Sequence, residues 1–81
     1  MKLFIANIAF SASEADLREL FEQIGPVTRC RLIMTNGKSR GYAFVEYESD
    51  LDAARAIDDL HESHFMGRRL VVQESRNGGQ R

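Results

Sequence analysis

The sequence contains one cysteine, Cys30, and this scarcity limits the covalent chemistry open to the chain. A lone cysteine cannot form a disulfide within its own chain, and Cys30 has no partner at C-x-x-C spacing. We therefore expect Cys30 to be a small core residue rather than a reactive thiol, in a protein of a reducing, intracellular setting.

Long apolar runs are also lacking. None approaches the roughly 20 residues needed to cross a bilayer. The opening segment, MKLFIANI, has neither the long hydrophobic region nor the small-residue cleavage site of a signal peptide. The sequence predicts no membrane segment and no membrane partner.

The regular elements follow from hydrophobic periodicity and from turn residues. Alternating apolar residues predict strands, and Ser13 and Ser49 are each followed three residues later by an Asp, as at helix starts. Gly25 and Pro26 end the first helix, and Asn36-Gly37 is a turn signal. The expected order is a strand over 2–7, a helix over 13–24, a strand over 27–34, a loop over 35–39, a strand over 40–47, a helix over 49–60, a loop with a small hairpin over 61–68, and a strand over 69–75.

This βαββαβ order predicts an α+β, ferredoxin-like sandwich. Each helix has a single apolar stripe, so both should pack on the same face of a four-stranded antiparallel sheet. Eighty-one residues suffice for one domain. We place that domain at residues 1–75 and expect 76–81, RNGGQR, to be a flexible polar tail that leaves the other sheet face uncovered.

The charges are unevenly distributed, although the net charge is only −1. The helical segments 13–24 and 48–60 hold nine of the twelve acidic residues and only two basic ones. The rest of the chain holds nine basic and three acidic residues. The sheet and loop side is therefore expected to be basic, which the net charge conceals.

Strand alternation places three aromatic residues, Phe4, Tyr42 and Phe44, on the uncovered face. Clustered exposed apolar side chains mark a binding surface, and flat aromatic rings stack on unpaired nucleic-acid bases. Cations that could hold the phosphates lie on the same face or beside it. They are Arg29, Arg31, Lys38 and Arg40.

Two segments of the sequence stand out as motifs. They are Arg40-Gly41-Tyr42-Ala43-Phe44-Val45-Glu46-Tyr47 and Leu3-Phe4-Ile5-Ala6-Asn7-Ile8. The first resembles, at every position, the octamer of the RNA recognition motif family, and the second is similar to the hexamer of that family. The segments 52–60 and 67–72 also resemble the family, so the resemblance covers residues 2 to about 75. One departure is the short loop between the second and third strands, which leaves less basic surface there.

The resemblance implies roles for single residues. Phe4 and Tyr42 would stack bases, Phe44 would touch base or sugar, and Arg40 would contact a phosphate. The end strands and the segment that follows the last strand would add Lys2, Val71, Gln73, Ser75 and Arg76, with Gln73 as the candidate for reading a base edge.

The implied function is binding of single-stranded RNA by a monomer, over about two to four nucleotides. Two alternatives remain open, which are single-stranded DNA and a protein partner on the same face. Arg40 could instead pair with Glu46, and we expect a second group of aromatic residues to serve the core or anchor loops. This group is Phe10, Phe21, Tyr47 and Phe65.

Catalytic and metal-binding patterns are absent from the sequence. His61 and His64 have no companion cysteine ligands, and the aromatic face carries neither a Ser/His/Asp set nor paired carboxylates. We expect no enzyme activity, no cofactor, no metal and no small-molecule substrate.

Overall fold

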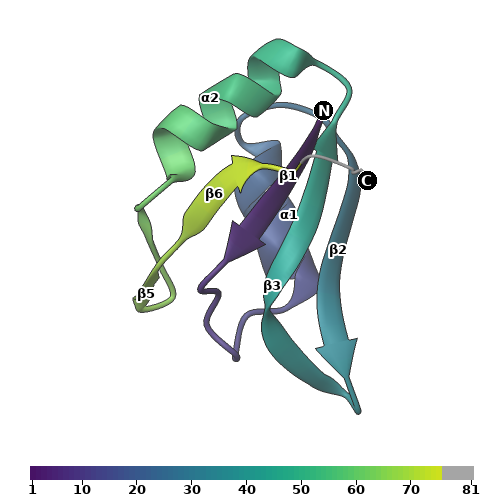
Figure 1. The fold of residues 1–81 in the computed structure, drawn as a ribbon, viewed down its shortest axis with the longest axis vertical. Coiled ribbons are helices and arrows are strands. Elements are labelled where there is room, and N and C mark those ends of the chain that lie inside the picture. Colours follow the sequence, from purple (N-terminus) through teal and green to yellow (C-terminus); the bar gives the residue numbers. More distant parts are fainter. Residues whose placement is uncertain (76–81) are drawn as a thin grey trace.

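A computed structural model describes residues 1–75, and the tail expected at 76–81, with Arg76, lies outside them. Figure 1 shows the arrangement of the chain. Its elements are β1 (Lys2–Ala6), α1 (Glu14–Glu22), β2 (Val27–Thr35), β3 (Lys38–Tyr47), α2 (Asp50–Leu60), β4 (His64–Phe65), β5 (Arg68–Arg69) and β6 (Val71–Glu74). Four strands form an antiparallel sheet in the order β2-β3-β1-β6, which confirms the ferredoxin-like prediction.

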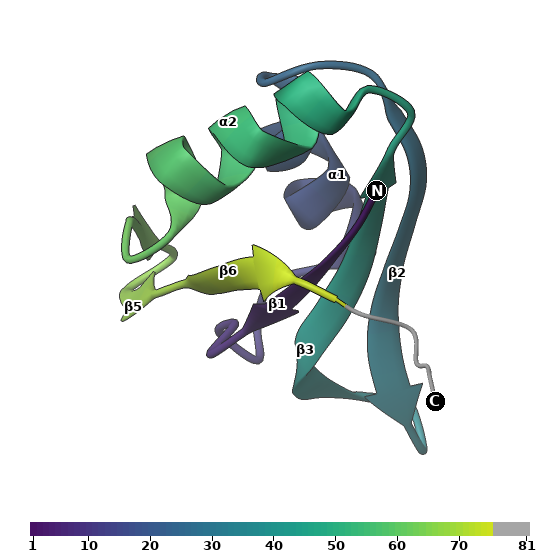
Figure 2. The ribbon, with the colours of Figure 1, turned by 45° about the horizontal axis from the view of Figure 1, so that its top comes forward.

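Both helices lie on one side of the sheet, as the single stripes predicted (Figures 1 and 2). Ser13 caps α1 through a capping box, in which its hydroxyl accepts from the Asp16 N–H and the Asp16 carboxylate accepts from the Ser13 N–H. Ser49 caps α2 by accepting from the Asp52 N–H at 3.2 Å. These caps fix where each helix begins after its strand.

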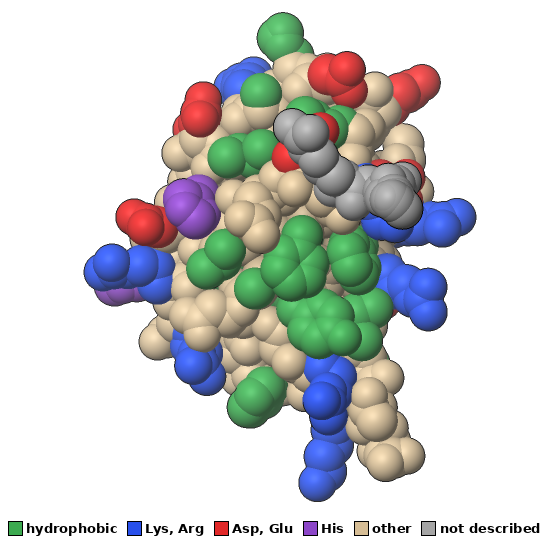
Figure 3. All heavy atoms as spheres, in the orientation of Figure 1, with side chains coloured by type: hydrophobic (Ala, Val, Ile, Leu, Met, Phe, Trp, Pro, Cys, Tyr) green, Lys and Arg blue, Asp and Glu red, His purple; other side chains and the backbone are tan. Residues whose placement is uncertain are grey.

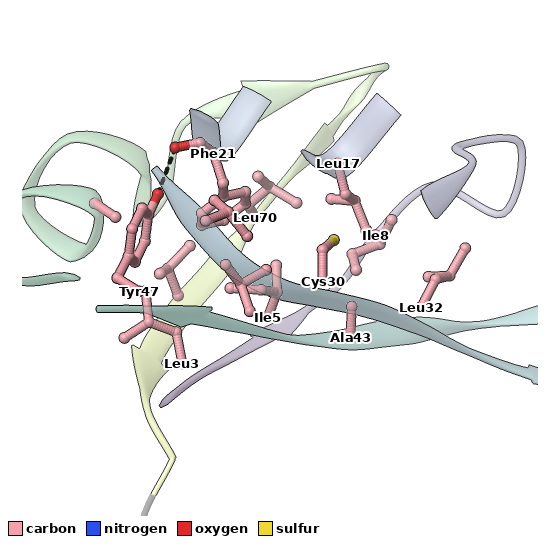
Figure 4. Close-up of a cluster of buried hydrophobic side chains, with 14 of the residues drawn as sticks. Leu3, Ile5, Ile8, Leu17, Phe21, Cys30, Leu32, Ala43, Tyr47 and Leu70 are labelled. Carbon is pink, nitrogen blue, oxygen red and sulfur yellow. Dashed lines mark hydrogen bonds between the residues drawn. The ribbon is translucent and has the colours of Figure 1, made fainter. Parts of the chain in front are cut away.

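The core fills the space between the helices and the sheet (Figure 4). Leu3 and Ile5 of β1 are fully buried, as are Ala43 and Val45 of β3. Phe21 of α1 packs against this layer, and so do the half-buried residues of both helices. Because alternate residues of β1 and β3 are used up in this core, the residues between them must face the other side.

Tyr47 ties the end of β3 to α1. Its ring is buried and its hydroxyl donates to the backbone carbonyl of Phe21. Burial raises the pKa of the Tyr47 phenol well above its ordinary value, and the nearby Asp52 carboxylate raises it further. The neutral phenol is thus the form that the fold stabilises.

The connection between β2 and β3 is shorter than the loop expected at 35–39. Asn36 and Gly37 alone make the turn, with φ of 54° and 76°, and Thr35 already pairs with Lys38. Two consecutive positive φ values match the right-handed twist of a hairpin, and Asn-Gly tolerates them best. Lys38 is therefore a strand residue, not a loop residue.

The pairing of β2 with β3 is irregular near the end of β2. Cys30 and Leu32 are buried, whereas Met34 is 51% exposed and lines a groove together with Leu32. The register shifts between Leu32 and Met34, close to the hairpin. At the same place the Leu32 N–H donates to Glu14 Oε2 at 2.9 Å, which ties the start of α1 to β2.

The last strand begins later than expected, because the predicted small hairpin takes up its first residue. Phe65 pairs with Arg68 around Met66-Gly67, and His64 pairs with Arg69. Leu70 then turns into the core, and β6 starts at Val71. No helix among residues 1–75 is long and apolar enough to cross a membrane.

Replacing Tyr47 by phenylalanine tests the link to α1. We expect Tyr47→Phe to lower the free energy of unfolding by about 0.5–1.5 kcal/mol near neutral pH, because one buried hydrogen bond is lost. Above about pH 10 the unfolded wild type releases the phenolic proton that the folded state retains, so wild-type stability should fall with pH. Urea unfolding near pH 7 and at about pH 10.5 should therefore show the gap between the two proteins narrowing. A constant gap would contradict the raised pKa.

Candidate nucleic-acid interface

Three aromatic rings meet on the uncovered face of the sheet. The Phe4 ring centroid lies 5.8 Å from that of Tyr42 and 5.6 Å from that of Phe44, with interplanar angles of 44° and 52°. Such tilted pairs are a favourable aromatic geometry, yet all three rings remain half-exposed. Because the rings are tilted and not stacked face to face, each keeps part of its own surface accessible.

Figure 3 views this face in the orientation of Figure 1. Hydrophobic side chains gather at its centre, over β1 and β3, and Lys and Arg side chains stand at its margins. The apolar cluster is thus bordered by positive charge, although the chain as a whole is slightly acidic.

The strand register aligns site residues from all four strands. Phe4 lies opposite Phe44 of β3 on one side and opposite Gln73 of β6 on the other. Phe44 in turn lies opposite Arg31 of β2. One row across the sheet therefore reads Arg31, Phe44, Phe4 and Gln73, which puts a cation at one end and an amide at the other.

The neighbouring row is more polar. Glu46 lies opposite both Arg29 of β2 and Lys2 of β1, so one acid sits between two cations. The Lys2 ammonium also stands 4.9 Å from the centroid of the Phe44 ring, in cation–π contact. The positive charges of Arg29 and Lys2 are thus partly offset by the Glu46 carboxylate opposite them, whereas Arg31 lies opposite an aromatic ring.

Arg40 and Lys38 lie at the start of β3, and both are exposed. Neither forms an ion pair with any residue from 1 to 75, so the pairing of Arg40 with Glu46 is not observed there. Gly41 follows with a φ of 82°, and its N–H donates to the Ser39 hydroxyl. Both cations therefore remain available to a ligand.

The far edge of the sheet carries the remaining expected residues. Gln73 is exposed beside Phe4, and Val71 is half-buried opposite Ala6. The Ser75 N–H donates to the Lys2 carbonyl at 2.8 Å, which continues the β1–β6 pairing to that position. Arg76 lies outside the described residues.

The second group of aromatic residues divides. Phe21 and Tyr47 are core residues and Phe65 packs against the core, as expected. Phe10 is not a core residue, because it is 68% exposed at the tip of a turn. The sequence signal was weak, since a single Phe between two small residues does not show which way a loop points.

Metal binding and thiol chemistry have little support among the described residues. Residues 1–75 hold no group of three or more His, Cys, Asp or Glu that could bind a metal ion. Cys30 is buried, and its burial, followed by the nearby Glu14, raises the pKa of the thiol. A raised pKa disfavours the reactive thiolate, in keeping with a core role.

Comparison with known proteins identifies the family. The model of the RNA recognition motif matches residues 3–71. A putative RNA-binding protein, RbpA of Synechocystis sp., is 37% identical over 86 residues, which cover 98% of this chain and 85% of the relative. The chain therefore belongs to the RNA recognition motif family of RNA-binding domains.

Solved structures agree in fold. The crystal structure of RNA Binding Protein PG1 superposes with a TM-score of 0.91 at 40% identity and covers 95% of both chains. A Sxl-lethal protein/RNA complex superposes with a TM-score of 0.92 at 34% identity, over 98% of this chain and 48% of that one. The chain spans only 11% of some longer curated relatives, in which the matching region is a small part.

Two adjacent residues of β1 test the separation of core from interface. Ile5→Ala should lower the free energy of unfolding by about 2–5 kcal/mol, because it opens a cavity in the core. Phe4→Ala should cost only about 1 kcal/mol, because the ring is only partly buried and its removal opens no closed cavity. Chemical unfolding of both variants measures the difference. Equal losses would mean that Phe4 is needed mainly for stability.

Proposed function

We propose that this domain binds about two to four nucleotides of single-stranded RNA on the uncovered sheet face, acting as a monomer and without catalysis. The observation that carries the proposal is the cluster of Phe4, Tyr42 and Phe44, held together yet half-exposed and bordered by cations. Base stacking on such rings contributes about 1–3 kcal/mol for each base.

The three rings have different parts in this proposal. The Lys2 ammonium stands over the Phe44 ring, so one face of Phe44 is already in contact with a cation. Phe4 and Tyr42 are therefore the base-stacking rings, and Phe44 contacts a sugar. The Lys2 ammonium then stands where it would also attract the adjoining phosphate.

Recognition of particular bases falls to the β6 edge. Gln73 lies directly opposite Phe4, so a base stacked on Phe4 presents its edge towards the Gln73 amide. An amide offers both donors and an acceptor, which suits a base edge. Ser75 and Arg76 follow in the chain and are proposed to extend this contact, together with Val71.

Phosphates are held near the opposite edge of the same sheet face, by residues of β2 and β3. Arg31 stands beside Phe44, and Lys38 and Arg40 border the hairpin end of β3. Arg29 contributes less, because Glu46 lies opposite it. The proposal also includes an intracellular location and residues 1–75 as the folded domain.

Titration with random-sequence oligomers tests the proposal. We expect wild type to bind a labelled RNA octamer, and Phe4→Ala/Tyr42→Ala/Phe44→Ala to lose most of the affinity while keeping the fold. Loss of two stacked bases alone predicts a weakening of about 30-fold or more. Fluorescence anisotropy measures binding, and circular dichroism confirms folding.

A DNA octamer of matching composition identifies the sugar preference. Equal affinity for both would show that no 2′-hydroxyl contact contributes, and would favour the single-strand DNA alternative. If wild type binds neither oligomer below millimolar concentration, the nucleic-acid proposal fails and a protein partner for this face becomes the better explanation.

The salt dependence of binding tests the role of Arg40. The logarithm of the binding constant should fall with the logarithm of salt concentration by about 0.7 for each phosphate contact. Arg40→Ala should reduce that slope by about one contact. Arg55→Ala removes the same charge from an exposed position of α2 and is the matched control, which should leave the slope unchanged. An unchanged slope in Arg40→Ala would remove Arg40 from the phosphate contacts.

A further inference from the structure

Phe10 is presented to solvent by a well-anchored turn. The Ala12 N–H donates to the Ala9 carbonyl at 3.0 Å, which closes a four-residue turn with Phe10 inside it. Ala9 and Ala12 are 7% and 4% exposed, whereas Phe10 is 68% exposed. Both ends of the turn are thus fixed in the core while its aromatic tip stands out.

One edge of the Phe10 ring rests on β3. A Cβ atom placed on Gly41 would lie 3.1 Å from Phe10 Cε1, closer than side chains normally approach. The Ile8 N–H donates to the Gly41 carbonyl at 2.9 Å and holds the turn beside the strand. The Phe10 ring therefore rests against Gly41, the residue that precedes Tyr42 in β3, while most of its surface stays exposed.

A groove of about 860 Å³ opens beside the ring, between this turn and the β2–β3 hairpin. Leu32 and Met34 line it on the apolar side, and Lys38 and Arg40 supply positive charge. The one acid among its lining residues, Glu14, already accepts from the Leu32 N–H. An aromatic ring, an apolar wall and two cations suit one more nucleotide.

We propose that Phe10 is a fourth nucleobase platform, which stacks a nucleotide beyond those on the sheet face and directs the RNA strand into this groove. The inference rests on the proposed function. It follows from continuity, because Arg40 lines the groove and, by strand alternation, lies on the same face of β3 as Tyr42 of the aromatic cluster. The groove thereby lengthens the bound segment past the two to four nucleotides that the sheet accommodates.

Two oligomer lengths separate this contact from the sheet contacts. Random-sequence RNA tetramers fill the sheet face, whereas octamers also reach Phe10. Phe10→Leu keeps an apolar side chain against Gly41 but removes the aromatic ring. It should weaken octamer binding about 5- to 150-fold and leave tetramer binding unchanged. The number of binding registers on each oligomer is the same for all variants, so it cancels from the comparison.

Two further variants complete the test. Phe10→Trp restores an aromatic face and should bind the octamer at least as tightly as wild type. Leu51→Ala, at a 64% exposed position of α2, is the control for loss of a surface apolar side chain and should change neither affinity. Thermal unfolding of each variant checks that the fold is kept.

The outcomes are distinguishable. If wild type binds tetramers and octamers but Phe10→Leu binds octamers equally well, this inference is overturned and the proposed function stands. If Phe10→Leu weakens tetramers and octamers alike, Phe10 is a support for the sheet and not a separate platform, which also overturns the inference. If wild type binds neither oligomer, the proposed function itself fails.

Discussion

The antiparallel pairing of β1 with β3 is the constraint on which the other features depend. It places Leu3 opposite Val45 and Ile5 opposite Ala43 beneath the helices, and by the same register it places Phe4 opposite Phe44 on the uncovered face. A slip of one residue would exchange the two sets, expose the core and bury the aromatic cluster. The same hydrogen bonds therefore hold both the core and the candidate interface in place. A change in the β1–β3 register would disrupt both.

Charge is divided along the same boundary. The helices carry most of the acidic residues and the sheet side carries most of the basic ones, so the molecule has two electrostatically different faces. At physiological ionic strength charges are screened over about 8 Å, and a strand approaching the sheet responds mainly to the nearest side chains. The slightly negative total thus has little influence on an RNA that approaches the basic side.

Much of this architecture follows from sequence alone, because a period of two in β1 and β3 and a single stripe on each helix leave few alternatives. The two Asp residues after Ser13 and Ser49 located the helix starts, and the octamer located the aromatic face. One failure concerns the hairpin between β2 and β3, where turn geometry sets the bounds of the strands. Lys38 joins a strand because Asn36 and Gly37 suffice for the turn.

The exposure of Phe10 cannot be predicted from the sequence for a different reason. Its exposure depends on the burial of Ala9 and Ala12 in the same turn and on the close approach of its ring to Gly41, and these are tertiary facts. These facts cannot be predicted from the local composition of the loop. The roles of single residues in RNA binding stay predictions, and they are motivated by the strand register, which aligns Arg31, Phe44, Phe4 and Gln73 in one row.

The contact between Glu14 and β2 affects whether copies of the domain associate at high local concentration. β2 forms one border of the sheet, where unpaired backbone groups invite another chain to add a strand. There the Leu32 N–H already donates to the Glu14 carboxylate. The register shifts on either side of residues 29–32 also make β2 too irregular to pair along its length with an added strand. Copies of this domain lined up at high density along one long transcript would therefore meet without polymerising edge to edge.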